Sequence, residues 1–490
     1  MSEQYQSATT KAQGFSFLPL VLLLAFILDT LLYGLVIPFL PAQVLALGAS
    51  QSVVGILFAS YAAGLLLATP LAGRLTDRFG GQPMVELGLL LLLASTLVYA
   101  SASTLPLLFL ARTLQGVAAA IPWTAGLAII AEHYSGIERY RRFTQVFSAT
   151  SIGTLVGPSL GGILYTWGGF QAPFFVVGGL IVLDAITTLA VFARLSHARK
   201  TQLRKSSFES AAQPLPSGTR PTSVQPLAYR RVAMALLITS AGALLVSLLD
   251  PTLPVLLADR YGLVPLTIGL VFGGMTVLFV LVQSVVGALL KKYNSGTALF
   301  FGLTIGPLAL ILVAVSGTLM HVLVALGILA FSYAFLLTPA LELLTQTAQQ
   351  AVARVKKGNV TSGSRRVRPQ NTAEKEVLPY GRLYASYSVA YSFGMLVGPV
   401  LASVAVTLLG WTLGLGLTGI ALFFLYLPLS LRMYFRAPPE LSPARTQESA
   451  SRIEILEILE AIELVQIVAT EETFEIEEIE VVGPTINERR

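Results

Sequence analysis

Twelve apolar stretches, each about as long as a membrane-spanning helix, dominate this 490-residue sequence. A helix needs roughly 20 apolar residues to cross the hydrocarbon core of a bilayer. Hydrophobic residues make up 54% of the chain and charged residues only 12%, which excludes a soluble globule. The sequence therefore predicts an all-α polytopic membrane protein with twelve transmembrane helices. They are expected at residues 18–40, 52–72, 84–102, 106–131, 144–166, 173–193, 232–257, 266–290, 297–316, 319–341, 384–409 and 411–431.

Basic residues alternate between the connections that join these stretches. Of the 32 Lys and Arg residues, 30 lie in the termini or in the even-numbered connections. Lys and Arg are retained on the cytoplasmic side of a membrane, so both termini are expected to be cytoplasmic. The alternation also supports the number of spans, because a missed or surplus span would scramble it.

A long polar connection divides the stretches six and six, and the two halves carry matching motifs. Gly153 to Gly162 reads GTLVGPSLGG and Gly394 to Leu401 reads GMLVGPVL, each in the fifth stretch of its half. Repeated halves of this kind form two similar bundles around a central site, as in alternating-access transporters. The expected layout is a cytoplasmic tail at 1–17, a six-helix bundle at 18–195, a cytoplasmic linker at 196–231, a second six-helix bundle at 232–435 with a cytoplasmic loop at 349–383, and an acidic cytoplasmic tail at 436–490.

Asp29 is the only charged residue in the first apolar stretch. A carboxylate within a bilayer is costly, so by default it faces the bundle interior or a water-filled path and serves ions or substrate. The alternative is an Asp that caps a polar neighbour between two helices. We expect Asp29 to take up a proton on one side of the membrane and to exchange it for a cationic solute on the other. The other candidate proton carriers are Asp184, Asp250 and Glu342.

Arg112 also lies inside an apolar stretch. A guanidinium stays charged there and needs a carboxylate, carbonyl groups or water. We expect it to act electrostatically on a proton-carrying Asp, with simple structural pairing as the alternative. In the fifth stretch, Gly153, Gly157 and Gly161 lie on one helical face and let another helix approach closely, although packing alone would produce the same spacing.

Several of these motifs resemble those of the major facilitator superfamily. Gly73 to Gly80, which reads GRLTDRFG, is similar to its loop motif, and Arg112 to Gly116, which reads RTLQG, is similar to the arginine motif of its fourth helix. Gly153 to Gly162 resembles the fifth-helix motif of its twelve-span, proton-coupled drug antiporters. The first-span Asp followed by Pro-x-x-Pro, and Asp250 to Pro254 (DPTLP), look like the vesicular amine transporters. The resemblance implies the major facilitator fold and proton-coupled transport.

The charges of the loop motif also suggest a role in conformational change. A carboxylate between two arginines at a helix end can form a charge-assisted latch that breaks when the bundles move apart, although a hydrophilic turn would look the same. The residues expected to serve conformational change are Gly73, Arg74, Asp77, Arg78, Gly80, Gln115, Gly116, Gly153, Gly157, Pro158, Gly161, Gly162, Gly398 and Pro399.

Two positions depart from the amine-transporter pattern. The second-span lysine of that branch falls on Tyr61, and its eleventh-span aspartate falls on Ser388. Both partners of an ion pair are therefore absent, which leaves no orphan charge but puts the substrate in doubt.

The predicted function is secondary active transport, as proton-coupled antiport of a cationic or amphipathic organic solute. A uniporter or proton symporter of another small solute, and a non-transporting receptor of the same fold, are the alternatives. No enzymatic activity, bound metal or nucleic acid is expected, and no cofactor is expected other than the proton gradient. The protein is expected to lie in a lipid bilayer. Its acidic tail is a candidate contact for a cytoplasmic partner. The residues expected to contact solute or protons are Asp29, Tyr33, Tyr61, Arg112, Asp184, Asp250, Glu342, Tyr387 and Tyr391, with core packing as the alternative for the tyrosines.

Overall fold

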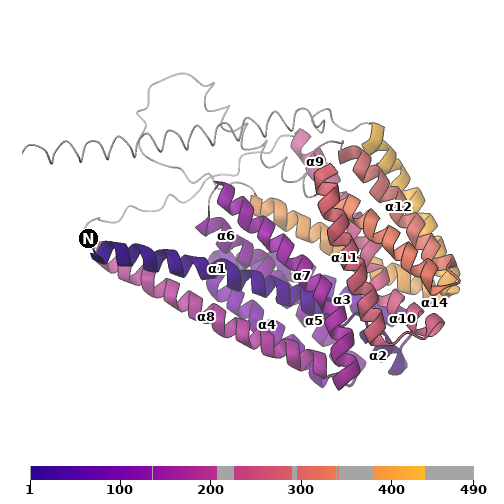
Figure 1. Cartoon of the computed structure of the whole chain (residues 1–490), viewed down its shortest axis with the longest axis horizontal. Helices are drawn as coiled ribbons and strands as arrows, with labels where there is room; N and C mark the ends of the chain where they lie inside the picture. The colour runs from indigo at the N-terminus through magenta and orange to yellow at the C-terminus, as the bar shows by residue number, and fades with distance from the viewer. Residues whose placement is uncertain are drawn as a thin grey trace, which may run out of the picture.

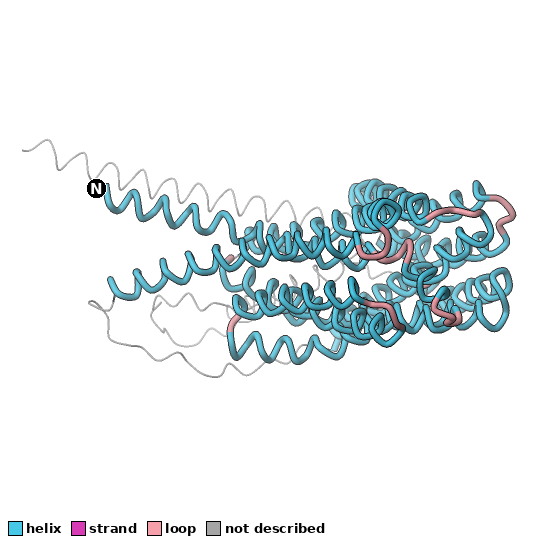
Figure 2. The backbone as a smooth tube through the Cα atoms, turned by 90° about the horizontal axis from the view of Figure 1, so that it is seen from below, coloured by secondary structure: helices cyan, strands magenta, loops and turns pink. Residues whose placement is uncertain are grey.

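The computed structural model describes residues 2–134, 136–206, 226–289, 295–337, 339–340 and 380–435. Every regular element in these ranges is helical, and the connections gather mainly at the end remote from the N-terminus (Figure 2). The acidic tail, Glu342 and most of the loop expected at 349–383 lie outside the described residues, as do positions 207–225 of the expected linker.

The first half of the chain runs from α1 to α8. Its helices are α1 (Ser2–Leu35), α2 (Leu40–Ala46), α3 (Gln51–Phe79), α4 (Gly81–Ser101), α5 (Leu105–Ile121), the π-helix η1 (Pro122–Gly126), α6 (Leu127–His133), α7 (Gly136–Gly168) and α8 (Ala172–Ser206). Because α1 begins at Ser2, the segment expected as an N-terminal tail is helical and continuous with the first span.

The second half begins after the linker. Its helices are α9 (Pro226–Ser247), α10 (Leu249–Tyr261), α11 (Pro265–Leu289), α12 (Ser295–Val315), a helix at Leu319–Leu337 and α14 (Tyr380–Phe435).

The helices confirm the predicted twelve-span fold. Ten of them, among the described residues, are long and apolar enough to cross a membrane. The last of these, Ser386–Arg432, contains two expected spans. A kink in α14 at Gly410, where φ is 75°, separates them. The remaining expected span lies in α7, whose apolar residues are diluted by glycines and hydroxyl side chains.

The repeat seen in the sequence is also present in the packing. A Cβ atom at Gly153 or Gly157 would collide with the backbone of α1, at the Ile27 and Leu31 carbonyl oxygens respectively. In the second half, a Cβ atom at Gly394 or Gly398 would meet α9 in the same way. Each Gly-x-x-x-Gly-Pro motif therefore permits close approach to the first helix of its own half.

The two halves meet at the end remote from the N-terminus and diverge toward the other end (Figure 1). One contact joins α7 to α11, where the Ser159 hydroxyl donates to the Gly269 carbonyl oxygen at 3.3 Å. A second joins α3 to the second half, where Gln51 Nε2 donates to the Pro251 carbonyl oxygen at 2.8 Å. The Ser52 hydroxyl donates to that of Thr407 at 2.7 Å. We call the region of these contacts the contact end.

Candidate functional site

Asp29 lies in α1, two turns before the helix gives way to a turn at 36–39. Its side chain is 1% exposed. Trp123 Nε1 donates a hydrogen bond to Asp29 Oδ2 at 3.3 Å, while Oδ1 has no hydrogen-bond partner. Trp123 stands in η1, the single π-helical turn that follows α5, and such turns are frequent at functional sites. The carboxylate thus keeps one buried oxygen free to receive a donor.

Arg112, on α5, is fully buried and surrounded by aromatic rings. Its guanidinium carbon lies 4.6 Å from the ring centre of Tyr33, 4.8 Å from that of Phe58 and 5.2 Å from that of Tyr61. Arg112 Nη1 donates to Gln115 Oε1 at 3.0 Å, and Nε and Nη2 have no hydrogen-bond partner. Aromatic faces stabilise this cation through their quadrupoles, which explains how an arginine is held without a direct carboxylate contact.

Tyr33 joins the two halves of the molecule. Its hydroxyl donates to Asp250 Oδ2 at 2.7 Å, and its ring lies 4.8 Å from that of Tyr61. Asp250 is 5% exposed and stands in the first turn of α10, where the helix N-terminus favours a negative charge. The hydrogen bond therefore links α1 of the first half to α10 of the second.

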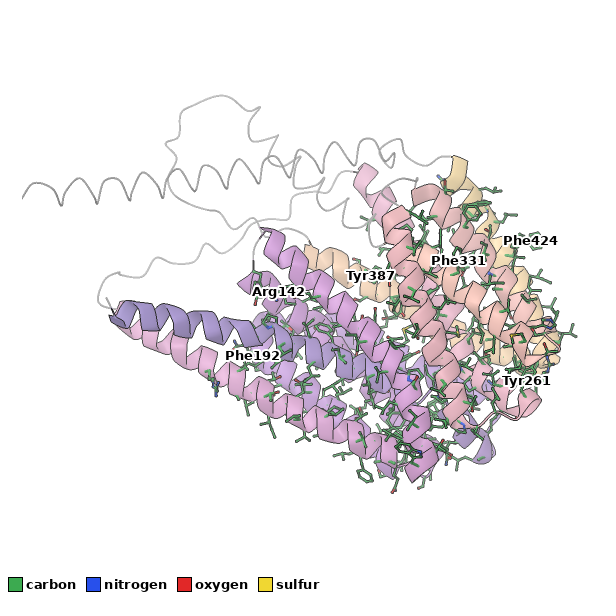
Figure 3. The ribbon with its side chains drawn as sticks, in the orientation of Figure 1. Arg142, Phe192, Tyr261, Phe331, Tyr387 and Phe424 are labelled. Atoms are coloured by element: carbon green, nitrogen blue, oxygen red, sulfur yellow. The ribbon has the colours of Figure 1, made fainter. Side chains whose placement is uncertain are left out.

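Tyrosines of the second half extend this group. The hydroxyls of Tyr333 and Tyr391 lie 3.2 Å apart, and the rings of Tyr387 and Tyr391 stack with centres 6.4 Å apart. Tyr391 and Tyr33 pack against the same cluster of buried apolar residues. Figure 3 shows Tyr387 between the two bundles, far from Tyr261 at the contact end. We call Asp29, Tyr33, Tyr61, Arg112, Asp250 and Tyr391 the central cluster.

One described carboxylate expected at the site, Asp184, does not join this group. Asp184 is fully buried on α8, where the Thr188 hydroxyl donates to its Oδ1 at 3.4 Å. Glu342 lies outside the described residues.

The loop-motif residues Arg74, Asp77 and Arg78 are exposed at the end of α3. Arg78 lies 5.2 Å from the ring centre of Phe79, and no ion pair of Asp77 occurs among the described side chains. Gly80 ends α3 with φ at 86°, which favours glycine. The latch between these charges stays a prediction.

The other motif residues lie at close helix contacts. A Cβ atom at Gly116 would collide with the Tyr61 carbonyl oxygen, so α5 and α3 touch where Arg112 and Tyr61 face each other. A Cβ atom at Gly162 would collide with the Pro265 carbonyl oxygen, and the Pro399 carbonyl oxygen lies against Gly55. Gly162 and Pro399 therefore stand at contacts between the halves. Gly73 has open space around it.

Sequence reasoning missed three residues of this site: Phe58, Trp123 and Tyr333. One of them carried a signal, because Trp123 directly follows Pro122, which interrupts a span. Phe58 and Tyr333 are ordinary apolar-span residues, so only their neighbours identify them.

Charge counting indicates what the central cluster can hold. If Asp29 and Asp250 are both ionised, their two negative charges and the positive charge of Arg112 leave one net negative charge next to several aromatic rings. A single monovalent cation, or a proton, would neutralise it, and the ring faces favour an organic cation.

The sequence matches the family described as Major Facilitator Superfamily over residues 22–356. The chain belongs to the major facilitator superfamily. This match covers the first half and most of the second, so the superfamily fold expected from the loop and arginine motifs is confirmed.

Curated relatives include the chromaffin granule amine transporter of Homo sapiens, 27% identical over 79% of this chain, and the vesicular acetylcholine transporter of Rattus norvegicus, 29% identical over 77%. The aligned regions span 66% and 65% of these relatives' own lengths. Among solved structures, a bacterial homologue of the human lysosomal transporter Spinster, in an inward-facing and occupied conformation, superposes with a TM-score of 0.62. It is 14% identical, and the match covers 86% of this chain and 96% of that one.

Proposed function

We propose that this protein is a secondary active transporter that exchanges protons for a cationic organic solute, such as an amine, by alternating access. The observation that carries the proposal is the placement of two buried carboxyl groups, Asp29 of one half and Asp250 of the other, near a single buried guanidinium, that of Arg112. The names of its amine and acetylcholine transporter relatives support a cationic solute.

The proton flux and the solute flux are coupled because a proton and a cationic solute compete for the same carboxylate. Asp29 has one buried oxygen without a partner, so either a proton or the cationic group of a solute can occupy it. Arg112 remains charged, and its aromatic surround keeps it from neutralising either carboxylate by direct contact. A solute that enters therefore displaces a proton, and a proton that returns displaces the solute.

The orientation of the carrier follows from the basic connections. With both termini cytoplasmic, the contact end faces the lumen or the exterior, and this structure corresponds to an inward-facing state. The solved Spinster homologue, which is inward-facing, supports that assignment. A vesicle membrane is the proposed location, in line with the named relatives.

The test is uptake of radiolabelled monoamines and choline esters into sealed vesicles that hold the purified protein, with and without an imposed pH gradient. Accumulation against a concentration gradient is expected only with the pH gradient. Asp29→Asn mimics the protonated carboxyl permanently, so it should abolish accumulation while assembly stays intact, and Asp29→Glu should keep some coupling. Equilibration without dependence on the pH gradient would indicate a uniporter, and binding without any movement of solute would indicate a receptor; either result contradicts the proposal.

A further inference from the structure

Trp123 stands at an irregular point of the first half. Pro122 begins η1, and a proline has no N–H to donate to the preceding helical turn. The chain passes here through a single π-helical turn before α6 begins. Turns of this kind are rare in helices and are frequent at functional sites. This one carries the indole that reaches Asp29, 94 positions earlier in the sequence.

Phe26 and Gly126 set the position of the indole ring. The ring centres of Phe26 and Trp123 lie 5.1 Å apart at an interplanar angle of 75°, which is an edge-to-face contact. Phe26 is 1% exposed and stands about one turn before Asp29 on α1. A Cβ atom at Gly126 would lie 3.1 Å from Phe26 Cζ, so glycine there lets η1 approach α1. Aromatic pairs prefer defined geometries, so Phe26 holds the ring with its N–H directed at the carboxylate.

This contact makes the two oxygens of the Asp29 carboxylate unequal. Trp123 Nε1 donates to Oδ2 at 3.3 Å, whereas Oδ1 is buried and has no hydrogen-bond partner. The terminal torsion of an aspartate is broad, so a carboxylate without a donor could turn over a wide range. With Oδ2 anchored, Oδ1 is the oxygen left to take a proton or to accept from a cationic group.

The ionisable groups of the neighbouring elements do not hold this carboxylate. α1 packs on α7, α8 and η1, and η1 itself carries no ionisable side chain. The side chains of residues 136–141 on α7 and 195–206 on α8 are not among those described. The described groups are placed as follows: Arg142 on α7 donates to Gln145, Asp184 on α8 accepts from Thr188, Arg194 on α8 is exposed, Arg112 on α5 lies among aromatic rings that include Tyr61 on α3, and Asp250 on α10 accepts from Tyr33.

We propose that Trp123 is a positioning residue for Asp29, because its N–H anchors Oδ2 and leaves Oδ1 as the oxygen at which proton and solute compete. The inference rests on the exchange proposed above, and it names the residue and the helical turn that prepare the carboxylate for that exchange. Since the indole contacts the carboxylate directly, its fluorescence should also respond to what Asp29 binds.

Tryptophan fluorescence tests this contact without any transport assay. The chain contains three tryptophans, so Trp167→Phe with Trp411→Phe leaves Trp123 as the sole emitter in the full-length protein. In lipid vesicles, acidification that protonates Asp29 should shift the emission of Trp123, because the negative charge next to the indole N–H is lost. Asp29→Asn in the same background should abolish the shift. No shift in the parent background, or an equal shift with Asp29→Asn, would overturn the proposal.

Two substitutions of Trp123 separate the donor from the ring. Trp123→Phe keeps a ring against Phe26 and removes the N–H, whereas Trp123→Gln removes the ring and keeps an N–H at the same number of bonds from Cβ. Trp123→Phe should raise the KM for the radiolabelled amine or choline ester that the parent accumulates by about tenfold, as expected for a lost hydrogen bond to a charged group. Its maximal uptake rate should change less, and Trp123→Gln should keep most of the affinity.

A ring that serves packing alone predicts the reverse order. A KM like that of the parent in Trp123→Phe, or an equal or larger loss in Trp123→Gln, would therefore overturn the positioning role, provided that gel filtration and thermal unfolding show both variants to be folded. The fluorescence response does not depend on solute transport. A parent that moves no solute but responds through Asp29 would refute the proposed antiport and keep the contact, whereas accumulation without that response would refute the role of Trp123 alone.

Discussion

At the scale of single residues, Tyr33 contacts both Arg112 and Asp250. Its ring lies over the guanidinium of Arg112 and its hydroxyl donates to Asp250 in the other half. Tyr61, which stands where amine transporters have a lysine, contributes only an aromatic face to Arg112. The ion pair of that branch is absent here, and a hydrogen bond from the neutral Tyr33 hydroxyl to Asp250 links the halves.

Tyr33→Phe removes this link and leaves the ring over Arg112 in place. A hydrogen bond to a charged group contributes about 1.5–3 kcal/mol, so thermal unfolding of the purified variant should begin at a lower temperature. The halves should also separate more readily, which double electron–electron resonance between spin labels at the contact end would measure as a larger separated population.

Tyr61→Phe is the matched control, because the Tyr61 hydroxyl makes no hydrogen bond among the described residues and its ring would remain. It should behave like the parent. An equal loss of stability in both variants would mean that ring packing, and not the hydrogen bond to Asp250, is what the substitution disturbs.

At the scale of helices, glycine-lined contacts set how closely α1 and α7 approach. The Cβ positions of Gly153, Gly157 and Gly161 all fall on backbone atoms of α1, including the Leu35 carbonyl oxygen at its last residue. This close contact fixes the position of α1 along α7, and therefore the position of Asp29, which lies on α1. The glycines thus act on the site through helix position.

Gly161→Ala should destabilise the protein, because the added methyl group would collide with the Leu35 carbonyl oxygen and force α1 and α7 apart. Overpacking of this kind costs about 1–3 kcal/mol. Gly179→Ala on α8 is the control, since nothing lies near its Cβ position and Ala is favoured over Gly in a helix by about 1 kcal/mol. Urea titration of the two variants in detergent should shift their midpoints in opposite directions, and a loss of stability in both would contradict the packing argument.

At the scale of the whole molecule, contacts between the halves concentrate at one end. Gln51 and Ser52 of α3 bind Pro251 and Thr407 of the second half, and α7 packs on α11 at Gly162 and Gly269. Alternating access requires these contacts to break while others form at the opposite end.

A disulfide at the contact end should stop the cycle. The chain contains no cysteine, and the hydroxyls of Ser52 and Thr407 lie 2.7 Å apart, so Ser52→Cys with Thr407→Cys introduces the only thiols. Oxidation should abolish uptake into vesicles, and a reductant should restore it. Each single-cysteine variant serves as a control and should be insensitive to oxidation. Full transport by the cross-linked protein would show that the contact end need not open.

The predicted loop latch would act in the opposite movement. Asp77 is exposed in this state, so Asp77→Asn should change the free energy of unfolding by less than about 0.5 kcal/mol. It should nevertheless slow exchange of solute between the two sides, because the predicted latch needs the Asp77 carboxylate to meet the arginines of the loop. Normal exchange rates at equal amounts of inserted protein would remove the latch from the mechanism.

Much of this architecture was predictable from the order of residues alone. Spans follow from apolar length, because a helix must be long enough to cross the bilayer with every backbone group bonded internally. The repeat of Gly153 to Pro158 at Gly394 to Pro399 predicted two similar bundles, and the charges of Asp29 and Arg112 within spans marked them as exceptional. These features are local or periodic, so the linear sequence contains them.

The partners of the buried charges were decided only by the tertiary structure. Tyr33 and Asp250 are separated by 217 positions, and the rotation of α1 against α10 brings them together. Asp184, which was expected with the other carboxylates, is instead buried on α8, which packs on α4 and α1. Hydropathy records that a residue lies within a span but not which neighbour its side chain faces, because that depends on how each helix turns and crosses the others.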